Sequence, residues 1–148
     1  MVALKYRGRH RTAERLALRL VRNPRCQSVL KTAEVITAVP LHEARLRGRG
    51  FNQADLLADA LARPLGLRRS TALMRTRDTP SQTHLSARAR RRNLVGAFTL
   101  APGHRLNGTI VVLVDDVVTT GATLRECATT LLDAGVREVR AVTVARAE

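Results

Sequence analysis

The stretch TIVVLVDDVVTTGATL, Thr109 to Leu124, joins an apolar strand pattern to a polar segment. Seven of the nine residues from 110 to 118 are apolar, but Asp115 and Asp116 interrupt the run. An apolar run without alternation is typical of a strand that is buried on both faces of a parallel sheet. Ligands of open α/β sheets bind outside the carboxyl ends of the strands. We therefore expect the strand to run into Asp115 and the two acids to face a ligand.

The segment TTGAT, Thr119 to Thr123, follows the acids and precedes a helical pattern. A helix N-terminus exposes unpaired N–H groups and the positive end of the helix dipole, so it binds phosphate. Gly121 lets the backbone approach a ligand closely, and three threonine hydroxyls add donors. The carboxylates of Asp115 and Asp116 suit sugar hydroxyls or a hydrated magnesium ion. Together these features predict a site for a phosphorylated sugar.

A structural interpretation of the same string is that Asp115 and Asp116 begin a turn and that Thr119 or Thr120 caps the next helix. The full order of apolar residues, acids and TTGAT favours the ligand site over this alternative. The chain contains neither GxGxxG nor GxxxxGK[ST], the glycine-rich patterns of dinucleotide and triphosphate sites.

Length and composition indicate one globular domain over residues 1–148, with 45% hydrophobic and 26% charged residues. No apolar run reaches the length of a membrane span. The first twenty residues carry scattered basic residues and no uninterrupted apolar region, so we expect no signal peptide and a cytoplasmic protein. Cys26 and Cys127 form no CxxC pair, so we expect small buried or half-buried hydrophobes rather than a disulfide or a zinc site.

The net charge is +14, and all but two of the 26 basic residues are arginine. Such a charge is compatible with a nucleic-acid surface, with a phosphorylated substrate, or with a genome that favours arginine codons. Tyr6, Phe51 and Phe98 are the only aromatic residues, which weakens the case for a single-strand binder that stacks bases. The charge alone therefore leaves these alternatives open.

Helical and strand patterns alternate along the chain. This alternation predicts an α/β fold with a mainly parallel sheet. Residues 75–94 show only weak periodicity and read as a functional mobile loop or a solvated helix and loop. The expected helices end near Asn23, cover 54–61 and follow Gly121; the expected strands lie at 34–41, 70–75, 96–100, 110–115 and 138–145.

The string VVLVDDVVTTGAT closely resembles the phosphoribosyl-pyrophosphate motif of type I phosphoribosyltransferases, and the rest of the chain resembles the ComF branch of that family. The resemblance covers nearly the whole chain in the expected order. It implies a type I phosphoribosyltransferase-like fold, with a mainly parallel central sheet flanked by helices, a flexible loop and a small or incomplete hood. It is carried by Ala3–Arg9 (ALKYRGR), Val39–Ala62 (VPLHEARLRGRGFNQADLLADALA) and Arg75–Phe98 (RTRDTPSQTHLSARARRRNLVGAF).

The resemblance also implies roles for particular residues. Asp115 and Asp116 would bind the ribose hydroxyls and, through ligand or water, a magnesium ion. The segment with Gln82 would be the flexible loop that folds over the substrate. The 5′-phosphate would be held by Thr119, Thr120, Gly121, Ala122 and Thr123, and the pyrophosphate by the short loop of Val39, Pro40, Leu41 and His42.

Displacement of pyrophosphate gathers negative charge on the leaving group, so cations aimed at it stabilise the transition state. Arginine can grip phosphate through a bidentate fork. We take Asp115, Asp116, Arg77 and Arg91 as catalytic candidates and Arg49 as a substrate-binding candidate. For each arginine the alternative is a solvated surface charge. Further candidates are Arg47, Arg75 and Arg92.

Many relatives of the ComF branch begin with a cysteine-rich zinc-binding segment, and this sequence resembles a member without it. Gly50 to Gln53 (GFNQ) match the family without an evident role, and Phe51 reads as a core residue. The acceptor is not indicated by any pattern. His42, His84 and His104 read as surface histidines, with His42 as a candidate for a test.

Two classes of function follow from this sequence. The first is a magnesium-dependent phosphoribosyltransferase that transfers the phosphoribosyl group of phosphoribosyl pyrophosphate to an unidentified nucleophile. The second is a non-catalytic ComF-type accessory protein in DNA uptake, which binds a nucleotide ligand, single-stranded DNA or the competence machinery. A homodimer is compatible with either, and no membrane span is expected.

Overall fold

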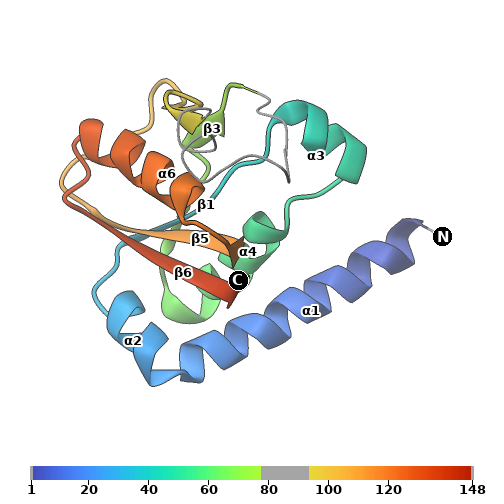
Figure 1. The fold of residues 1–148 in the computed structure, drawn as a ribbon. Coiled ribbons are helices and arrows are strands. Elements are labelled where there is room, and N and C mark those ends of the chain that lie inside the picture. Colours follow the sequence, from blue (N-terminus) through green and yellow to red (C-terminus); the bar gives the residue numbers. More distant parts are fainter. Residues whose placement is uncertain (1, 78–93, 148) are drawn as a thin grey trace.

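The computed structural model describes residues 2–77 and 94–147. Its centre is a sheet of four parallel strands in the order β2-β1-β5-β6 (Figure 1). Their bounds are β1 Val35–Ala38, β2 Arg68–Ser70, β5 Ile110–Val118 and β6 Glu138–Arg146. The expected α/β fold with a mainly parallel sheet is confirmed.

The apolar half of the opening stretch is the centre of this sheet. β5 lies between β1 and β6, with Val35 opposite Val111 and Val111 opposite Val139. Its residues from Ile110 to Val114 are all buried. A strand paired on both edges and covered on both faces can be apolar throughout, which explains the missing alternation.

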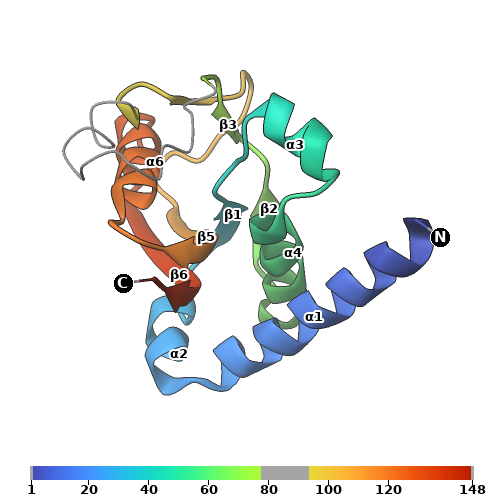
Figure 2. The ribbon, with the colours of Figure 1, turned by 45° about the vertical axis from the view of Figure 1, so that its right-hand side comes forward.

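Helices cover both faces of the sheet (Figures 1 and 2). On one face Val111 and Leu113 pack with Cys127 and Leu131 of α6. On the other face Val112 and Val114 pack with residues of α1, α2 and α4. The helix bounds are α1 Val2–Arg22, α2 Pro24–Leu30, α4 Gln53–Leu65 and α6 Ala122–Asp133. The alternating faces of β5 therefore hold together two separate apolar layers.

Three local expectations need correction. The strand does not end at Asp115, because β6 pairs with β5 as far as Val118. The segment between the loop Val39–His42 and α4, for which no helix was expected, contains a short helix, α3, over Glu43–Arg49. The single strand expected over 70–75 is two strands, because the chain leaves the sheet after Ser70. The second of them, β3 (Leu73–Arg75), pairs antiparallel with β4 (Phe98–Leu100) as a separate hairpin.

Two other expectations concern single residues and the membrane. Cys26 is half-buried and Cys127 is buried, and both are free thiols, as expected. Burial is also the main cause that raises the pKa of the Cys127 thiol. No helix in the described ranges is long and apolar enough to cross a membrane.

Candidate functional site

Asp115 and Asp116 lie where β5 loses its neighbour β1. The pairing of β1 with β5 ends at Ala38 opposite Val114, whereas β6 continues along the other edge. The Asp116 N–H donates to Asp115 Oδ1 at 2.9 Å, and the Val117 N–H donates to Asp116 Oδ1 at 2.8 Å. The two carboxylates therefore stand at the sheet edge and accept hydrogen bonds from the backbone that follows each of them.

Burial raises the pKa of Asp115 to about 7, against an ordinary value of 3.8, and the neighbouring Asp116 carboxylate adds to the rise. The backbone N–H of Asp116 acts in the opposite direction and lowers this pKa. Two adjacent carboxylates of which one is poorly solvated are costly to hold charged. Such an arrangement is more common at binding and catalytic sites than at ordinary strand ends.

The segment from Thr119 to Thr123 turns the chain from β5 into α6. Gly121 is the N-cap residue of α6 and has a φ of 72°, in the left-handed region that glycine adopts without strain. The structure gives Gly121 no capping side chain, and the Thr120 hydroxyl accepts only a long hydrogen bond of 3.4 Å from the Ala122 N–H. The threonine cap of the structural interpretation is therefore weak, and the first-turn N–H groups of α6 have no partner within the helix.

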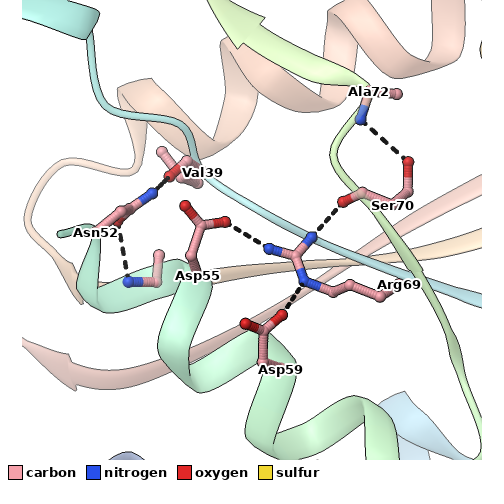
Figure 3. Close-up of polar contacts among 8 residues, drawn as sticks. Val39, Asn52, Asp55, Asp59, Arg69, Ser70 and Ala72 are labelled. Carbon is pink, nitrogen blue, oxygen red and sulfur yellow. Dashed lines mark hydrogen bonds and ion pairs between the residues drawn. The ribbon is translucent and has the colours of Figure 1, made fainter. Parts of the chain in front are cut away.

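The loop Val39–His42 follows β1 and lies directly beside this edge. The Val39 N–H donates to the carbonyl oxygen of Val114 at 2.8 Å, one residue before Asp115. The Val39 carbonyl accepts from Asn52 Nδ2 at 3.0 Å (Figure 3). Both backbone groups of Val39 are thus held, so the loop begins at a defined place next to the acids.

Asn52 is a site-forming residue whose role the sequence did not reveal. It is buried, and its Oδ1 accepts from the Ala54 N–H at 3.1 Å as the N-cap of α4 (Figure 3). An asparagine just before an amphipathic pattern is a capping signal, so this half of the role could have been found. The bond to Val39 could not, because it depends on how α4 packs against β1.

A second polar cluster holds α4 to the edge strand β2. The Arg69 guanidinium contacts the carboxylates of Asp55 and Asp59, with Nε 2.7 Å from Asp59 Oδ1 (Figure 3). It also donates to the carbonyl oxygen of Ser70. Asp55 and Asp59 lie on α4, the helix that Asn52 caps. The cluster therefore holds α4 in place, and Asn52 at the start of α4 holds the loop Val39–His42.

The remaining candidates are spread more widely. His42 is half-buried and caps α3, its Nδ1 accepting from the Ala44 N–H at 3.3 Å. Arg49 is exposed in the last turn of α3. Arg77 is exposed and donates to the carbonyl oxygen of Val95. Gln82 and Arg91 lie outside the described residues, as do His84, Arg92 and most of the expected flexible loop at 75–95.

The further candidates Arg47 and Arg75 have partners of their own, and His104 lies on the surface. Arg47 pairs with Glu43 one turn earlier on α3. The Arg75 guanidinium lies 5.6 Å from the centre of the Phe98 ring, and its Nε donates to the Arg77 carbonyl oxygen at 3.3 Å. His104 is exposed in the turn before β5. The ion pairs that the described residues form with one another involve the carboxylates of Glu34, Glu43, Asp55, Asp59 and Glu138.

A cavity of about 350 Å³ borders Asp116 on the α1 and α4 side of the sheet. Its lining combines Asp116 and Val117 of β5 and Val144 and Ala145 of β6 with residues of α1 and of the start of α4. A second hollow, of about 390 Å³, lies between α1 and the outer side of α4 and includes neither acid. The first cavity is therefore the one that belongs to the candidate site.

The acid pair offers hard oxygen donors of the kind that magnesium prefers. In the described part of the chain, no group of three or more His, Cys, Asp or Glu side chains could hold a metal ion. Magnesium usually binds proteins through one or two carboxylates, with substrate phosphates and water as its other ligands. Asp115 and Asp116 fit that pattern.

Comparison with known proteins identifies the family of this chain. The family model described as the phosphoribosyl transferase domain matches residues 46–148. The chain is 42% identical over 139 residues to competence protein F of Haemophilus influenzae, covering 93% of this chain and 61% of that protein. It is 46% identical over 127 residues to the DNA utilization protein YhgH of Escherichia coli O6:H1, covering 85% of this chain and 55% of that protein.

A solved structure shows the same fold. Glutamine phosphoribosylpyrophosphate amidotransferase from B. subtilis superposes with a TM-score of 0.57 and 20% sequence identity. The match covers 91% of this chain and 26% of that one. This chain spans somewhat more than half the length of its two curated relatives. With the type I phosphoribosyltransferase-like fold thus confirmed, the chain belongs to the phosphoribosyl transferase domain family, in its ComF branch.

Proposed function

We propose that this chain binds phosphoribosyl pyrophosphate with magnesium at the carboxyl edge of β1 and β5 and transfers its phosphoribosyl group to a nucleophile. The observation that carries the proposal is the bond from the Val39 N–H to the Val114 carbonyl oxygen. It sets the loop Val39–His42 beside the acid pair, while the opposite end of the pair runs into the N-terminus of α6. A ligand with a sugar between two phosphate groups matches that order.

Each part of the site suits one part of this ligand. Asp115 and Asp116 can accept hydrogen bonds from two ribose hydroxyls. The Thr119–Thr123 segment offers backbone N–H groups and threonine hydroxyls to the 5′-phosphate. The loop Val39–His42 borders the place of the pyrophosphate, with Arg49 and Arg77 as exposed cations on nearby elements and Gln82 and Arg91 as candidates outside the described ranges.

In the proposed reaction the bond from ribose C1 to the pyrophosphate oxygen breaks, and its electron pair leaves with pyrophosphate. The lone pair of the nucleophile forms the new bond to C1. Magnesium, when bound, neutralises charge on the pyrophosphate. Asp115 and Asp116 hold the ribose and, by their negative charge, favour the positive character that develops on the sugar ring. The loop Val39–His42 binds the pyrophosphate end of the ligand and Thr119–Thr123 binds the 5′-phosphate end, so the ribose between them is held in one orientation.

Calorimetric titration with phosphoribosyl pyrophosphate and magnesium tests the binding. We expect micromolar affinity for the native chain. Asp116→Asn should weaken it by roughly tenfold or more, since a hydrogen bond to a charged group contributes about 1.5–3 kcal/mol. Asp133→Asn removes the same charge from an exposed position at the end of α6 and serves as the control. No detectable heat for the native chain would refute the proposal.

Transfer is tested by release of pyrophosphate from the bound ligand in the presence of a panel of bases and amines. Release that depends on both magnesium and an added nucleophile supports a transferase. Release without an added nucleophile would be hydrolysis by water rather than transfer. No release with any nucleophile would limit the function to ligand binding.

A second candidate function, an accessory protein that holds single-stranded nucleic acid, is favoured by the outer face of α1. Arg11, Arg15, Arg19 and Arg22 are exposed there, and none has an ion-pair partner among the described residues. The names of the two relatives refer to competence and DNA utilization. Fluorescence anisotropy with a labelled oligonucleotide should then show affinity that falls steeply with salt. Salt-insensitive or absent binding would exclude it.

A further inference from the structure

Two stretches that carry the resemblance to the ComF branch have no part in the proposed function. They lie in contact in the structure. Arg9 closes the ALKYRGR stretch on α1, and Phe51 belongs to the GFNQ stretch before α4. The Arg9 guanidinium carbon lies 3.9 Å from the centre of the Phe51 ring. Phe51 is half-buried and absent from both buried apolar layers, so its expected place in the core is wrong. The two residues instead form one wall of the cavity beside Asp116.

The cavity has the size and composition of a small-molecule site. Its volume of about 350 Å³ falls within the range of roughly 300–1,000 Å³ that is typical of ligand pockets. Leu16, Leu56 and Val144 contribute apolar lining, and Asp116, which belongs to the proposed ribose site, also lines the cavity. The Phe51 ring in this lining favours a planar aromatic ligand, with which it can pack, over a flexible chain.

Arg9 supplies the charge that selects the ligand. A guanidinium that lies over a ring face keeps its N–H groups in its own plane, where they can donate to a carboxylate in a bidentate fork. In the described ranges Arg9 has no carboxylate within ion-pair distance. Gln53 also lines the cavity, and the described residues give its amide no hydrogen-bond partner. Both groups are therefore available to a ligand.

The cavity lining carries charges of both signs, which come from different elements of the fold. Asp116, at the sheet edge, repels an anion, while Arg9 and Gln53, which lie on α1 and at the start of α4, can bind one. A ring with an acidic substituent would therefore place the substituent at Arg9 and its remaining edge toward Asp116. That edge would border the place where the proposed function puts the ribose.

We propose that the cavity between α1, Phe51 and Asp116 binds a planar aromatic carboxylic acid, held by Arg9 through its carboxylate and by Phe51 through its ring. This inference rests on the proposed function in one respect only, namely that the bound acid would be the nucleophile that accepts the phosphoribosyl group. Binding of the acid to the cavity itself requires no phosphoribosyl pyrophosphate. Arg9 is then a residue that determines which ligand is accepted.

Nicotinate and nicotinamide are suitable probes, because they share one ring and differ in the charge of the substituent. Binding of each to the full chain is measured by ligand-detected NMR titration without phosphoribosyl pyrophosphate. We expect nicotinate to bind about tenfold or more tightly than nicotinamide, the size of one charge-assisted contact. Adenine, a larger neutral ring, serves as a third arm and should bind no better than nicotinamide.

Three variants locate the binding. Arg9→Gln should remove the preference for the acid, whereas Arg11→Gln, which removes the same charge from an exposed position on α1, should leave it. Phe51→Leu should weaken the binding of nicotinate and of nicotinamide by a similar factor, because it removes the aromatic ring from the cavity wall. Circular dichroism checks that each variant is folded. Equal affinity for acid and amide, adenine as the best ligand, or an equal effect of Arg9→Gln and Arg11→Gln would overturn the proposal.

The two proposals fail in different measurements. If phosphoribosyl pyrophosphate does not bind the native chain in calorimetry, the proposed function fails, and a nicotinate preference that requires Arg9 still supports the cavity site. If phosphoribosyl pyrophosphate binds but the nicotinate preference is absent, the cavity inference alone fails.

Discussion

The side chain of Asn52 joins the start of α4 to the end of β1, because its Nδ2 donates to the Val39 carbonyl oxygen at 3.0 Å while its Oδ1 caps the helix. One buried side chain thereby couples the GFNQ stretch to the loop that borders the acid pair. The loop position is determined by packing of α4, which in turn is held to β2 through Arg69.

Asn52→Ala should lower both stability and ligand affinity. The change removes the cap and leaves the Val39 carbonyl without its donor, with an expected cost of about 2–4 kcal/mol in the free energy of unfolding. Urea denaturation measures it. Asn23→Ala removes a comparable cap from α2 at an exposed site and should cost only about 1 kcal/mol. Equal costs for the two variants would show that the Val39 bond contributes nothing.

Asp115→Asn should stabilise the free protein increasingly as the pH rises. The folded state raises the pKa of Asp115 to about 7, so between the ordinary value and about 7 the folded state binds more protons than the unfolded one, and stability falls with rising pH. Asparagine has no such penalty. Melting temperatures of variant and native chain should therefore diverge from about pH 4 to about pH 7 and then stay apart. A constant difference across that range would contradict the prediction.

Gly121→Ala should affect binding beyond its effect on stability. A side chain at a φ of 72° costs about 1 kcal/mol in the folded state, and a bent cap would misplace the first turn of α6. Gly108→Ala is the matched control, since Gly108 has a φ of 73°, with open space around it, at the other end of β5. Both variants should lower the melting temperature by a similar amount. Only Gly121→Ala should weaken the binding of phosphoribosyl pyrophosphate measured by calorimetry.

Arg69→Met should loosen the packing of α4 against β2. The Asp55 and Asp59 carboxylates are 45% and 57% exposed, so each ion pair contributes only about 0.2–1 kcal/mol. The loss of the donor to the Ser70 carbonyl oxygen adds to this cost. A double-mutant cycle with Asp59→Asn in low and high salt measures the coupling, which should shrink with salt. Salt-independent coupling would contradict this account.

Much of the fold follows from the pattern of residues along the chain. The apolar run before Asp115 predicted the central strand, because a strand buried on both faces is apolar throughout. The apolar stripe of Leu57, Ala58 and Leu61 predicted α4, because its spacing matches the helical period. The short helix α3 and the break after Ser70 were missed, because seven or fewer residues carry too little periodicity to outweigh packing.

The sequence by itself determined the acid pair, the glycine turn and the helix that follows, because these features depend on residues next to one another along the chain. Only the tertiary structure decided that Val39 lies beside Val114, that Asn52 holds Val39, and that Arg9 covers Phe51 next to Asp116. Those contacts join segments separated by 13 to more than 70 residues. They depend on strand order and helix packing, which are set by the burial of the two apolar layers as a whole and not by any local pattern.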